Sequence, residues 1–175
     1  MLILVTGGAG SGKSEFAEGI VAASGTDERC YLATMRIWDE ECRRRVERHR
    51  RARAGKGFLT VECPLDLAEV AEQVPPGAVV LLEDLTNLAS NQWFGGVGPE
   101  KTERVILTGL ERVCEKAALT VVVANELFSD GLDYDEETER FLAAQAALNR
   151  LLCARADKVF EVVCGIPVCW KGEQK

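Results

Sequence analysis

The clearest chemistry near the N-terminus belongs to a glycine-rich segment, residues 7–14, which reads Gly-Gly-Ala-Gly-Ser-Gly-Lys-Ser. It matches the pattern G-x-x-x-x-G-K-[ST] at every defined position. In such a loop the backbone N–H groups and the start of the next helix attract phosphate, the lysine reaches the outer phosphates, and the final hydroxyl binds Mg²⁺. The predicted nucleotide-binding residues here are Gly7, Gly8, Ala9, Gly10, Ser11, Gly12, Lys13 and Ser14.

The segments on either side of this loop have the expected character. Residues 1–6 are an apolar run with the composition of a buried strand, and residues 15–23 place Phe16, Ile20 and Ala23 on one helical face. A glycine-rich turn without a ligand is the alternative, but strand, loop and helix in this order form the context in which the motif binds phosphate. The sequence therefore predicts a nucleotide-binding protein of the P-loop class.

Acidic and amide side chains follow two further apolar runs. Residues 78–84 end in Glu83-Asp84, and residues 119–124 are followed by Asn125-Glu126. Ligands of parallel sheets bind at the carboxyl ends of the strands. We expect Glu83 to hold Mg²⁺ or to orient the nucleophile, because Asp84 could instead cap a helix beginning at Leu85. Asn125-Glu126 could contact the nucleotide or a second substrate, or could cap a turn.

The chain has a single histidine, His49, within a predicted polar helix over residues 38–54. Three interpretations are open: a surface histidine without a role, part of a basic helix that contacts nucleic acid, or a nucleophile that attacks the α-phosphate of a nucleotide. Nearby cations would stabilise the charge that develops in the third case. The net charge of −7 weakens the nucleic-acid interpretation. The arginines of this helix are Arg43, Arg44, Arg45, Arg48, Arg50, Arg51 and Arg53.

The elements that must position these residues alternate between strands and helices. The length of 175 residues predicts one domain, residues 1–175. Strands are expected at 29–34, 58–62, 158–164 and 168–170, besides those already named, and helices at 65–74, 85–94, 100–116 and 135–156. Continuously apolar strands predict an α/β fold with a mostly parallel sheet and helices on both faces. A tight turn at 165–167 makes the last strand an antiparallel edge strand.

Several classes of protein do not fit this composition. No apolar run approaches the ~20 residues of a membrane span, and the N-terminus lacks the basic segment of a signal peptide. The seven cysteines are odd in number and contain no C-x-x-C pair, so neither a disulfide framework nor a zinc site is expected. This cysteine usage predicts a cytoplasmic protein.

Taken together, the motifs resemble one family. They are T-G-G-A-x-S-G-K-S at 6–14, Y-L-A-T at 31–34, R-V-E-R-H-R at 45–50, L-L-E at 81–83 and N-E at 125–126. Their order and spacing resemble those of the adenosylcobinamide kinase / adenosylcobinamide-phosphate guanylyltransferase family over nearly the whole chain. The phosphate loop alone would not be specific, but the combination is.

The resemblance implies a bifunctional enzyme of cobalamin biosynthesis with a RecA-like fold, assembled as a homotrimer. It would phosphorylate adenosylcobinamide with ATP or GTP, and then transfer GMP from GTP to that phosphate through a GMP-histidine intermediate. It implies His49 as the nucleophile, while the phosphate-loop motif and the acid at its strand end predict Lys13 as a further catalytic residue and Ser14 and Glu83 as Mg²⁺ ligands. The remaining implied nucleotide contacts are Ala33, Thr34, Met35, Arg50, Arg51, Ala52, Arg53, Glu62 and Glu83. Its partners would be these small molecules, without nucleic acid.

The sequence departs from the family pattern at two places. Arg48 stands where a second histidine is common beside the nucleophile, and residues 127–134 lack the V-G-x-G-[IV]-V-P segment. Beyond that segment, Arg140, Phe141 and Asn149 match. Two alternatives therefore stay open: a P-loop kinase or nucleotidyltransferase for another small molecule, and a GTP-binding protein without catalysis.

Overall fold

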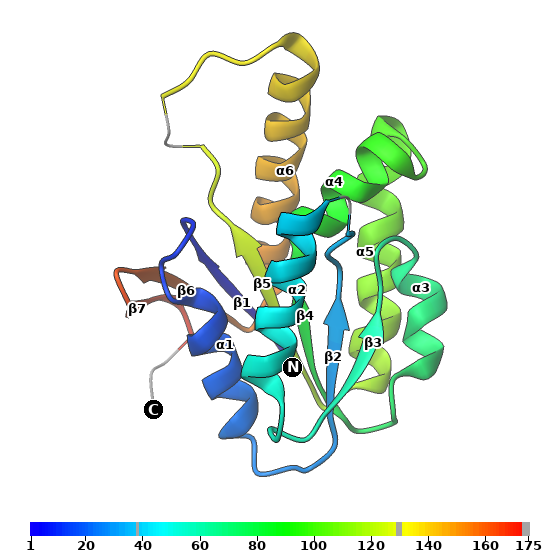
Figure 1. Cartoon of the computed structure of the whole chain (residues 1–175), viewed down its shortest axis with the longest axis vertical. Helices are drawn as coiled ribbons and strands as arrows, with labels where there is room; N and C mark the ends of the chain where they lie inside the picture. The colour runs from blue at the N-terminus through cyan, green and yellow to red at the C-terminus, as the bar shows by residue number, and fades with distance from the viewer. Residues whose placement is uncertain (38, 129–130, 173–175) are drawn as a thin grey trace.

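The computed structural model describes residues 1–37, 39–128 and 131–172, without the side chains of Arg45, His49, Ala52 and Arg53. Its described strands form one sheet in the order β3-β2-β4-β5-β1-β6-β7 (Figure 1). The strands are β1 (Leu2–Gly7), β2 (Arg29–Ala33), β3 (Phe58–Glu62), β4 (Val79–Glu83), β5 (Leu119–Asn125), β6 (Lys158–Val163) and β7 (Ile166–Lys171). Neighbours pair in parallel except β6 and β7, which confirms the predicted sheet and its antiparallel edge.

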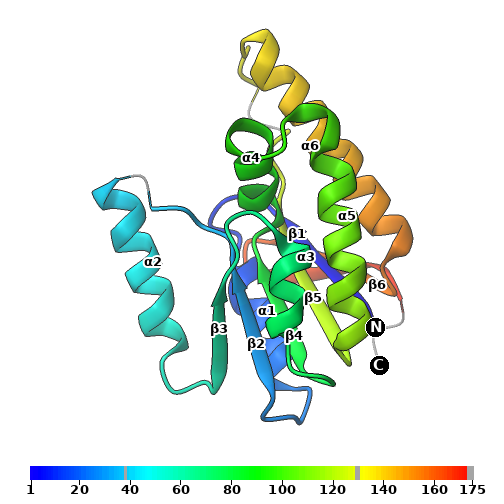
Figure 2. The ribbon, with the colours of Figure 1, turned by 90° about the vertical axis from the view of Figure 1, so that its right-hand side faces the viewer.

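Helices cover both faces of the sheet, as predicted. They are α1 (Lys13–Ala22), α2 (Glu40–Arg53), α3 (Leu67–Val70), the 3-10 helix η1 (Ala71–Gln73), α4 (Leu85–Gly95), α5 (Pro99–Lys116) and α6 (Glu136–Arg155). Figure 2 shows α2 on one side of the sheet and α3, α5 and α6 on the other. Helix α1 lies on the same face as α2, and α4 and α6 rise past the carboxyl ends of the strands (Figure 1).

The first strand shows why its sequence is apolar throughout. β1 pairs with β5 along one edge and with β6 along the other, so it is an interior strand of the sheet. Ile3 and Val5 are buried in the apolar cluster that α1 covers, whereas Leu4 is buried in the cluster of the opposite face. Alternate residues therefore serve two different cores, which removes the polar positions of a half-exposed strand.

The terminal hairpin turns earlier than predicted. Cys164 and Gly165 form the turn with φ of 50° and 82°, and β7 already begins at Ile166. Two consecutive positive φ values are typical of the two-residue turns that join antiparallel strands. Pro167 thus lies within β7, where a sheet edge tolerates a residue that has no N–H to donate.

Two helices differ from the expected bounds. The segment predicted as one helix over 65–74 is a single α-helical turn, α3, continued by the 3-10 helix η1. Helix α2 begins at Glu40, because the Asp39 side chain caps it by accepting a hydrogen bond from the Cys42 N–H at 2.7 Å. Trp38, the predicted first residue of that helix, lies outside the described residues.

Within the described ranges, no helix combines the length and apolar character that crossing a bilayer requires.

Candidate functional site

The phosphate loop, residues 7–14, is packed tightly against the terminal hairpin. Gly7 has φ 155°, and a Cβ there would come within 2.6 Å of the Val162 carbonyl oxygen. Gly12 has φ 91°, and a Cβ there would meet the Gly165 Cα at 3.3 Å. The Gly165 N–H also donates to the Ser11 carbonyl oxygen at 2.8 Å. Glycine is needed at both positions because the backbone conformation and the neighbouring backbone exclude a side chain.

Lys13 is the first residue of α1 and is nearly buried, with 7% of its surface exposed. Its Nζ donates to the Gly8 carbonyl oxygen at 3.0 Å, so the side chain folds back over the loop. Burial lowers the pKa of Lys13, and the negative charges of Asp84 and Glu83 partly oppose that shift. The loop therefore presents a positive charge close to two acids.

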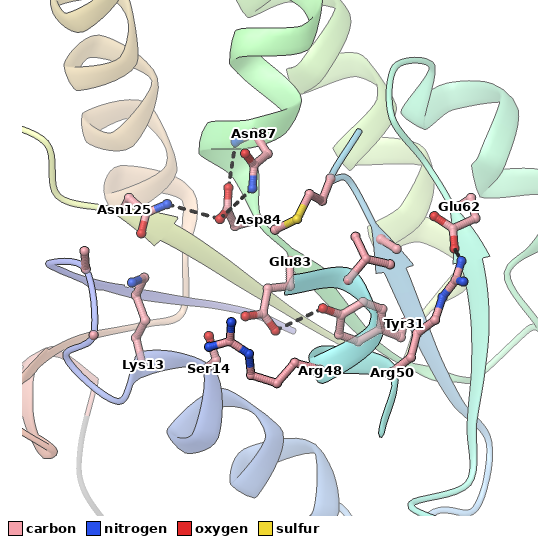
Figure 3. A pocket seen from close by; sticks show the side chains of 15 residues that line it. Lys13, Ser14, Tyr31, Arg48, Arg50, Glu62, Glu83, Asp84, Asn87 and Asn125 are labelled. Carbon is pink, nitrogen blue, oxygen red and sulfur yellow. Dashed lines mark hydrogen bonds and ion pairs between the residues drawn. The ribbon is translucent and has the colours of Figure 1, made fainter. Parts of the chain in front are cut away.

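These groups share one cavity of about 380 Å³ at the carboxyl ends of the strands (Figure 3). Seven segments contribute to it: the phosphate loop with the start of α1, the end of β2 and the residues after it, α2, β3, β4, α4 and β5. Its lining residues are Ala9, Gly10, Lys13, Ser14, Tyr31, Ala33, Met35, Val46, Arg48, Arg50, Glu62, Glu83, Asp84, Asn87 and Asn125.

Asp84 combines the two roles that the sequence left open, since it both caps α4 and lines the cavity. Its Oδ1 accepts from the Asn87 N–H at 2.6 Å, and its Oδ2 accepts from the Asn87 and Asn125 side-chain amides, each at 3.1 Å. Burial raises the pKa of Asp84 to about 6, and the hydrogen bond from the Asn87 N–H limits that rise. The Glu83 charge adds to the increase.

Glu83 points into the cavity beside it, where its Oε2 accepts from the Tyr31 hydroxyl at 3.3 Å (Figure 3). Thr34 holds the backbone at this corner: its Oγ1 donates to the Asp84 carbonyl oxygen at 2.8 Å and accepts from the Asp84 N–H at 2.7 Å. The buried Asn91 amide donates in turn to the Thr34 carbonyl oxygen at 2.8 Å. Thr34 thus ties the end of β2 to the acids at the end of β4.

Helix α2 contributes to the cavity wall through Val46, Arg48 and Arg50. The Arg50 Nη2 lies 2.6 Å from the Glu62 Oε1, which joins α2 to the end of β3 (Figure 3). His49 stands between the two lining arginines in the helix, and its side chain lies outside the described part of the structure.

The structure places the sequence-predicted residues in three groups. Those that line the cavity are Ala9, Gly10, Lys13, Ser14, Ala33, Met35, Arg50, Glu62 and Glu83. Those that shape its walls or lie away from it are Gly7, Gly8, Ser11, Gly12, Thr34 and Arg51. Arg51 is exposed and lies 3.7 Å from the Glu47 carboxylate. The third group is His49, Ala52 and Arg53, whose side chains are outside the described part of the structure.

Sequence reasoning did not identify Tyr31, Val46 and Asn87 as site residues. Asn87 could have been found, because it lies three residues after Asp84 in the first turn of the predicted helix and so faces its cap. Tyr31 and Val46 carry no such signal, since an aromatic residue in a strand and a valine in a helix usually indicate core packing. Asn125, left open between substrate contact and turn cap, lines the cavity and donates to Asp84.

The comparisons with known proteins cover almost the whole chain. A model of the family "Cobinamide kinase / cobinamide phosphate guanyltransferase" matches residues 3–170. The Escherichia coli bifunctional adenosylcobalamin biosynthesis protein CobU is 34% identical over 96% of this chain and 98% of its own length. The protein CobP from Pseudomonas aeruginosa is 31% identical, over 97% of each chain.

Solved structures with much lower identity share the fold. The flagellar accessory protein FlaH from Methanocaldococcus jannaschii superposes with a TM-score of 0.55 at 11% identity, over 98% of this chain and 78% of its own. An ATPase of a type III secretion system superposes with a TM-score of 0.56 at 13% identity, over 96% of this chain and 56% of its own. These likenesses agree with the predicted P-loop fold. The family match and the two relatives show that the chain belongs to the cobinamide kinase / cobinamide phosphate guanyltransferase family.

Proposed function

We propose that the 380 Å³ cavity at the phosphate loop carries both reactions of the family. The observation that supports this is the convergence of three kinds of group on one cavity. Lys13 and Ser14 come from the phosphate loop, Glu83 comes from β4, and the arginine-rich helix α2 forms the opposite wall. A phosphoryl transfer site needs the first two groups, and a nucleotidyl transfer site needs cations near the α-phosphate.

In the first reaction ATP or GTP phosphorylates a hydroxyl group of adenosylcobinamide. The hydroxyl oxygen attacks the γ-phosphorus, the bond to the bridging β–γ oxygen breaks, and the nucleoside diphosphate leaves. The hydroxyl proton passes to the acids at the end of β4. Lys13 moves from the Gly8 carbonyl oxygen to the transferred phosphoryl group and stabilises its charge.

In the second reaction His49 is the nucleophile. An imidazole nitrogen attacks the α-phosphorus of GTP, pyrophosphate leaves, and GMP stays bound through an N–P bond. A phosphate oxygen of adenosylcobinamide phosphate then attacks the same phosphorus and breaks the N–P bond, which gives adenosylcobinamide-GDP and free histidine. Arg48 and Arg50 flank His49 in the helix and line the cavity, so they are placed to stabilise the negative charge that develops.

Ser14 and Glu83 are the proposed ligands of Mg²⁺. Their hydroxyl and carboxylate oxygens are the hard donors that this ion prefers, and both side chains line the cavity. The described residues contain no cluster of three or more His, Cys, Asp or Glu side chains able to hold a metal. That fits an ion which reaches the protein largely through nucleotide phosphates and water. When bound, Mg²⁺ neutralises phosphate charge in both reactions.

The remaining parts of the proposal concern assembly and location. We expect residues 1–175 to act as one nucleotide-binding domain, three copies to form a homotrimer with the cavity near a subunit boundary, and the enzyme to work in the cytoplasm. The family resemblance supports the trimer, the length of 175 residues supports the single domain, and the cysteine usage supports the cytoplasm.

The decisive experiment uses GTP labelled at the α-phosphate. Wild-type protein is incubated with this GTP and Mg²⁺, denatured, and tested for label that stays on the chain. We expect acid-labile, alkali-stable label that is absent from His49→Ala. Arg44→Ala is the matched control, because Arg44 is an exposed arginine of the same helix whose side chain approaches Glu40. Wild-type protein that binds GTP without label, or equal labelling of His49→Ala, would refute the nucleophile.

A further inference from the structure

A second cavity of about 360 Å³ lies between α4, α5 and α6. These helices lie together on the face of the sheet opposite α2 (Figure 2). None of the residues that line it also lines the nucleotide cavity. Its size is within the range of small-molecule sites in proteins.

Two buried polar atoms in the wall of this cavity have no hydrogen-bond partner. One is the indole N–H of Trp93, a donor, and the other is the side-chain oxygen of Gln145, an acceptor. Trp93 is 8% exposed and Gln145 is 1% exposed. A buried polar atom without a partner costs ~1–3 kcal/mol, so native structures contain few of them. Two such atoms of opposite character, in two residues that line one cavity, are a donor and an acceptor that a single ligand could satisfy.

Aromatic and aliphatic side chains form the apolar part of the wall. The Trp93 and Phe141 rings pack edge to face, with centroids 5.7 Å apart, and Ala144 and Leu148 continue the surface. Phe94 also packs against Phe141, with 5.4 Å between the two ring centroids, and helps to hold the Phe141 ring in place. A planar ligand would bury its apolar area against these side chains.

The charges that line the cavity balance. Glu100 and Glu103 come from α5, as does Arg104, while Arg140 comes from α6. All four residues are exposed, in contrast to Trp93 and Gln145. Two negative and two positive side chains give no preference for an ion, so the cavity suits a neutral molecule.

We propose that this cavity binds a neutral, planar ligand through a primary carboxamide group. The carboxamide oxygen accepts from the Trp93 indole N–H, and the carboxamide NH₂ donates to the Gln145 side-chain oxygen. Gln145 already uses its own NH₂ to donate to the Asn149 Oδ1 at 2.9 Å, which leaves its oxygen for the ligand. A small turn of the glutamine amide about its soft last torsion brings that oxygen into the cavity.

Benzamide and methyl benzoate form a matched pair of probes, because they share the ring and the carbonyl group but only benzamide has N–H donors. We expect benzamide at millimolar concentration to move the indole resonance of Trp93 in a spectrum of ¹⁵N-tryptophan-labelled protein, and methyl benzoate to bind at least about fivefold more weakly. No movement with benzamide would overturn the proposal. Equal binding of the two probes would show that the cavity binds only through apolar contacts, which would also overturn the proposal.

Two variants test the two hydrogen bonds separately. Trp93→Phe keeps an aromatic ring and removes the N–H, and Gln145→Leu keeps a side chain of similar size and removes the whole amide, including its hydrogen bond to Asn149. Each should weaken benzamide binding at least about fivefold, measured by calorimetry after the unfolding midpoint confirms a folded protein. Trp170→Phe, an exposed tryptophan on β7, is the control and should bind as wild type does. If Trp93→Phe does not fold, Gln145→Leu alone tests the proposal. Benzamide binding by Gln145→Leu equal to that of wild type would overturn the proposal.

The carboxamide could belong to a free small amide or to the substrate, since the corrin ring of cobinamide carries primary carboxamide side chains. Cobinamide is therefore titrated into the same labelled protein. Movement of the Trp93 resonance, with displacement of benzamide, assigns the cavity to an arm of the substrate. Movement with benzamide alone assigns it to a separate ligand. These titrations measure binding and not catalytic turnover. Their outcome is therefore independent of the labelling of His49 that tests the proposed function.

Discussion

Lys13 shares its cavity with Glu83 and Asp84, and the three charges act on one another. Burial favours a neutral lysine, while the two acids favour its protonated form. The site therefore keeps a positive charge available where phosphates are expected, although the side chain is almost fully buried. That balance makes Lys13 and Asp84 the most informative residues to replace.

Replacing Lys13 by alanine should reduce both reactions about 10²–10³-fold, because the charge that stabilises the phosphates and the developing transition state is lost. Turnover with cobinamide and nucleotide measures the effect, together with the dissociation constant of the nucleotide. Lys56→Ala is the control: Lys56 pairs with Glu18 and does not line the cavity. Activity of Lys13→Ala within about tenfold of wild type would argue against the proposed role.

Asp84 should make the free energy of unfolding depend on pH. Its folded-state pKa is about 6, above its ordinary value of 3.8, so only the folded state holds the proton between those values. The resulting stabilisation is complete below pH 3.8 and is lost as pH rises through 6, about 3 kcal/mol in all. In Asp84→Asn this dependence should disappear.

Urea unfolding of both proteins in metal-free buffer, at several pH values from 4.5 to 8, tests this. The stability of wild type relative to Asp84→Asn should fall with rising pH, and titrating groups that do not interact with Asp84 cancel in the difference. A difference that stays constant across the series would show that the folded Asp84 carboxyl does not have a raised pKa.

At the scale of elements, local patterns predicted most of the fold, whereas contacts between distant segments could not be predicted. The phosphate loop was predictable because strand, loop and helix adjoin in sequence. The hydrogen bond from Asn125 to Asp84 joins residues 41 positions apart, and the Arg50–Glu62 pair crosses from a helix to a strand. Such contacts depend on which strands become neighbours, and no periodicity encodes that.

Two helical glycines offer a matched test of element packing. Gly109 of α5 touches α3 closely, since a Cβ there would lie 2.7 Å from the Leu67 Cβ and 2.9 Å from the Ala68 nitrogen. Gly109→Ala should therefore lower the free energy of unfolding by about 1–3 kcal/mol. Gly19 of α1 is exposed with nothing near its added Cβ, so Gly19→Ala should raise it by about 0.5–1 kcal/mol.

Chemical denaturation of the two variants beside wild type gives both values. Because the substitution is the same, opposite signs would isolate the contact between α3 and α5. If both substitutions raised the free energy of unfolding, helix propensity and not this contact would control the effect at Gly109.

At the scale of the whole molecule, the edge of the sheet at β3 is open. Leu59 in this strand is 50% exposed, and the neighbouring cavity wall contains the Arg50–Glu62 pair. An uncovered edge strand is a surface that another chain can occupy. The trimer proposed from the family resemblance should appear in solution as a particle of three times the 19.1 kDa chain mass. Light scattering during size-exclusion chromatography measures it, and a mass of one chain at micromolar concentration would refute the trimer.

The hydrogen bond between the phosphate loop and the hairpin of β6 and β7 has a consequence for synthesis of the protein on the ribosome. Residues 7–14 are translated long before Gly165, whose N–H donates to the Ser11 carbonyl oxygen. Strand β6, which lies beside β1, is also translated late. A nascent chain thus carries its complete nucleotide motif, without the backbone that holds it in shape, until β6 and Gly165 have been made. Tight nucleotide binding should begin only after the hairpin of β6 and β7 has been translated, so nascent chains that lack it would not sequester nucleotide.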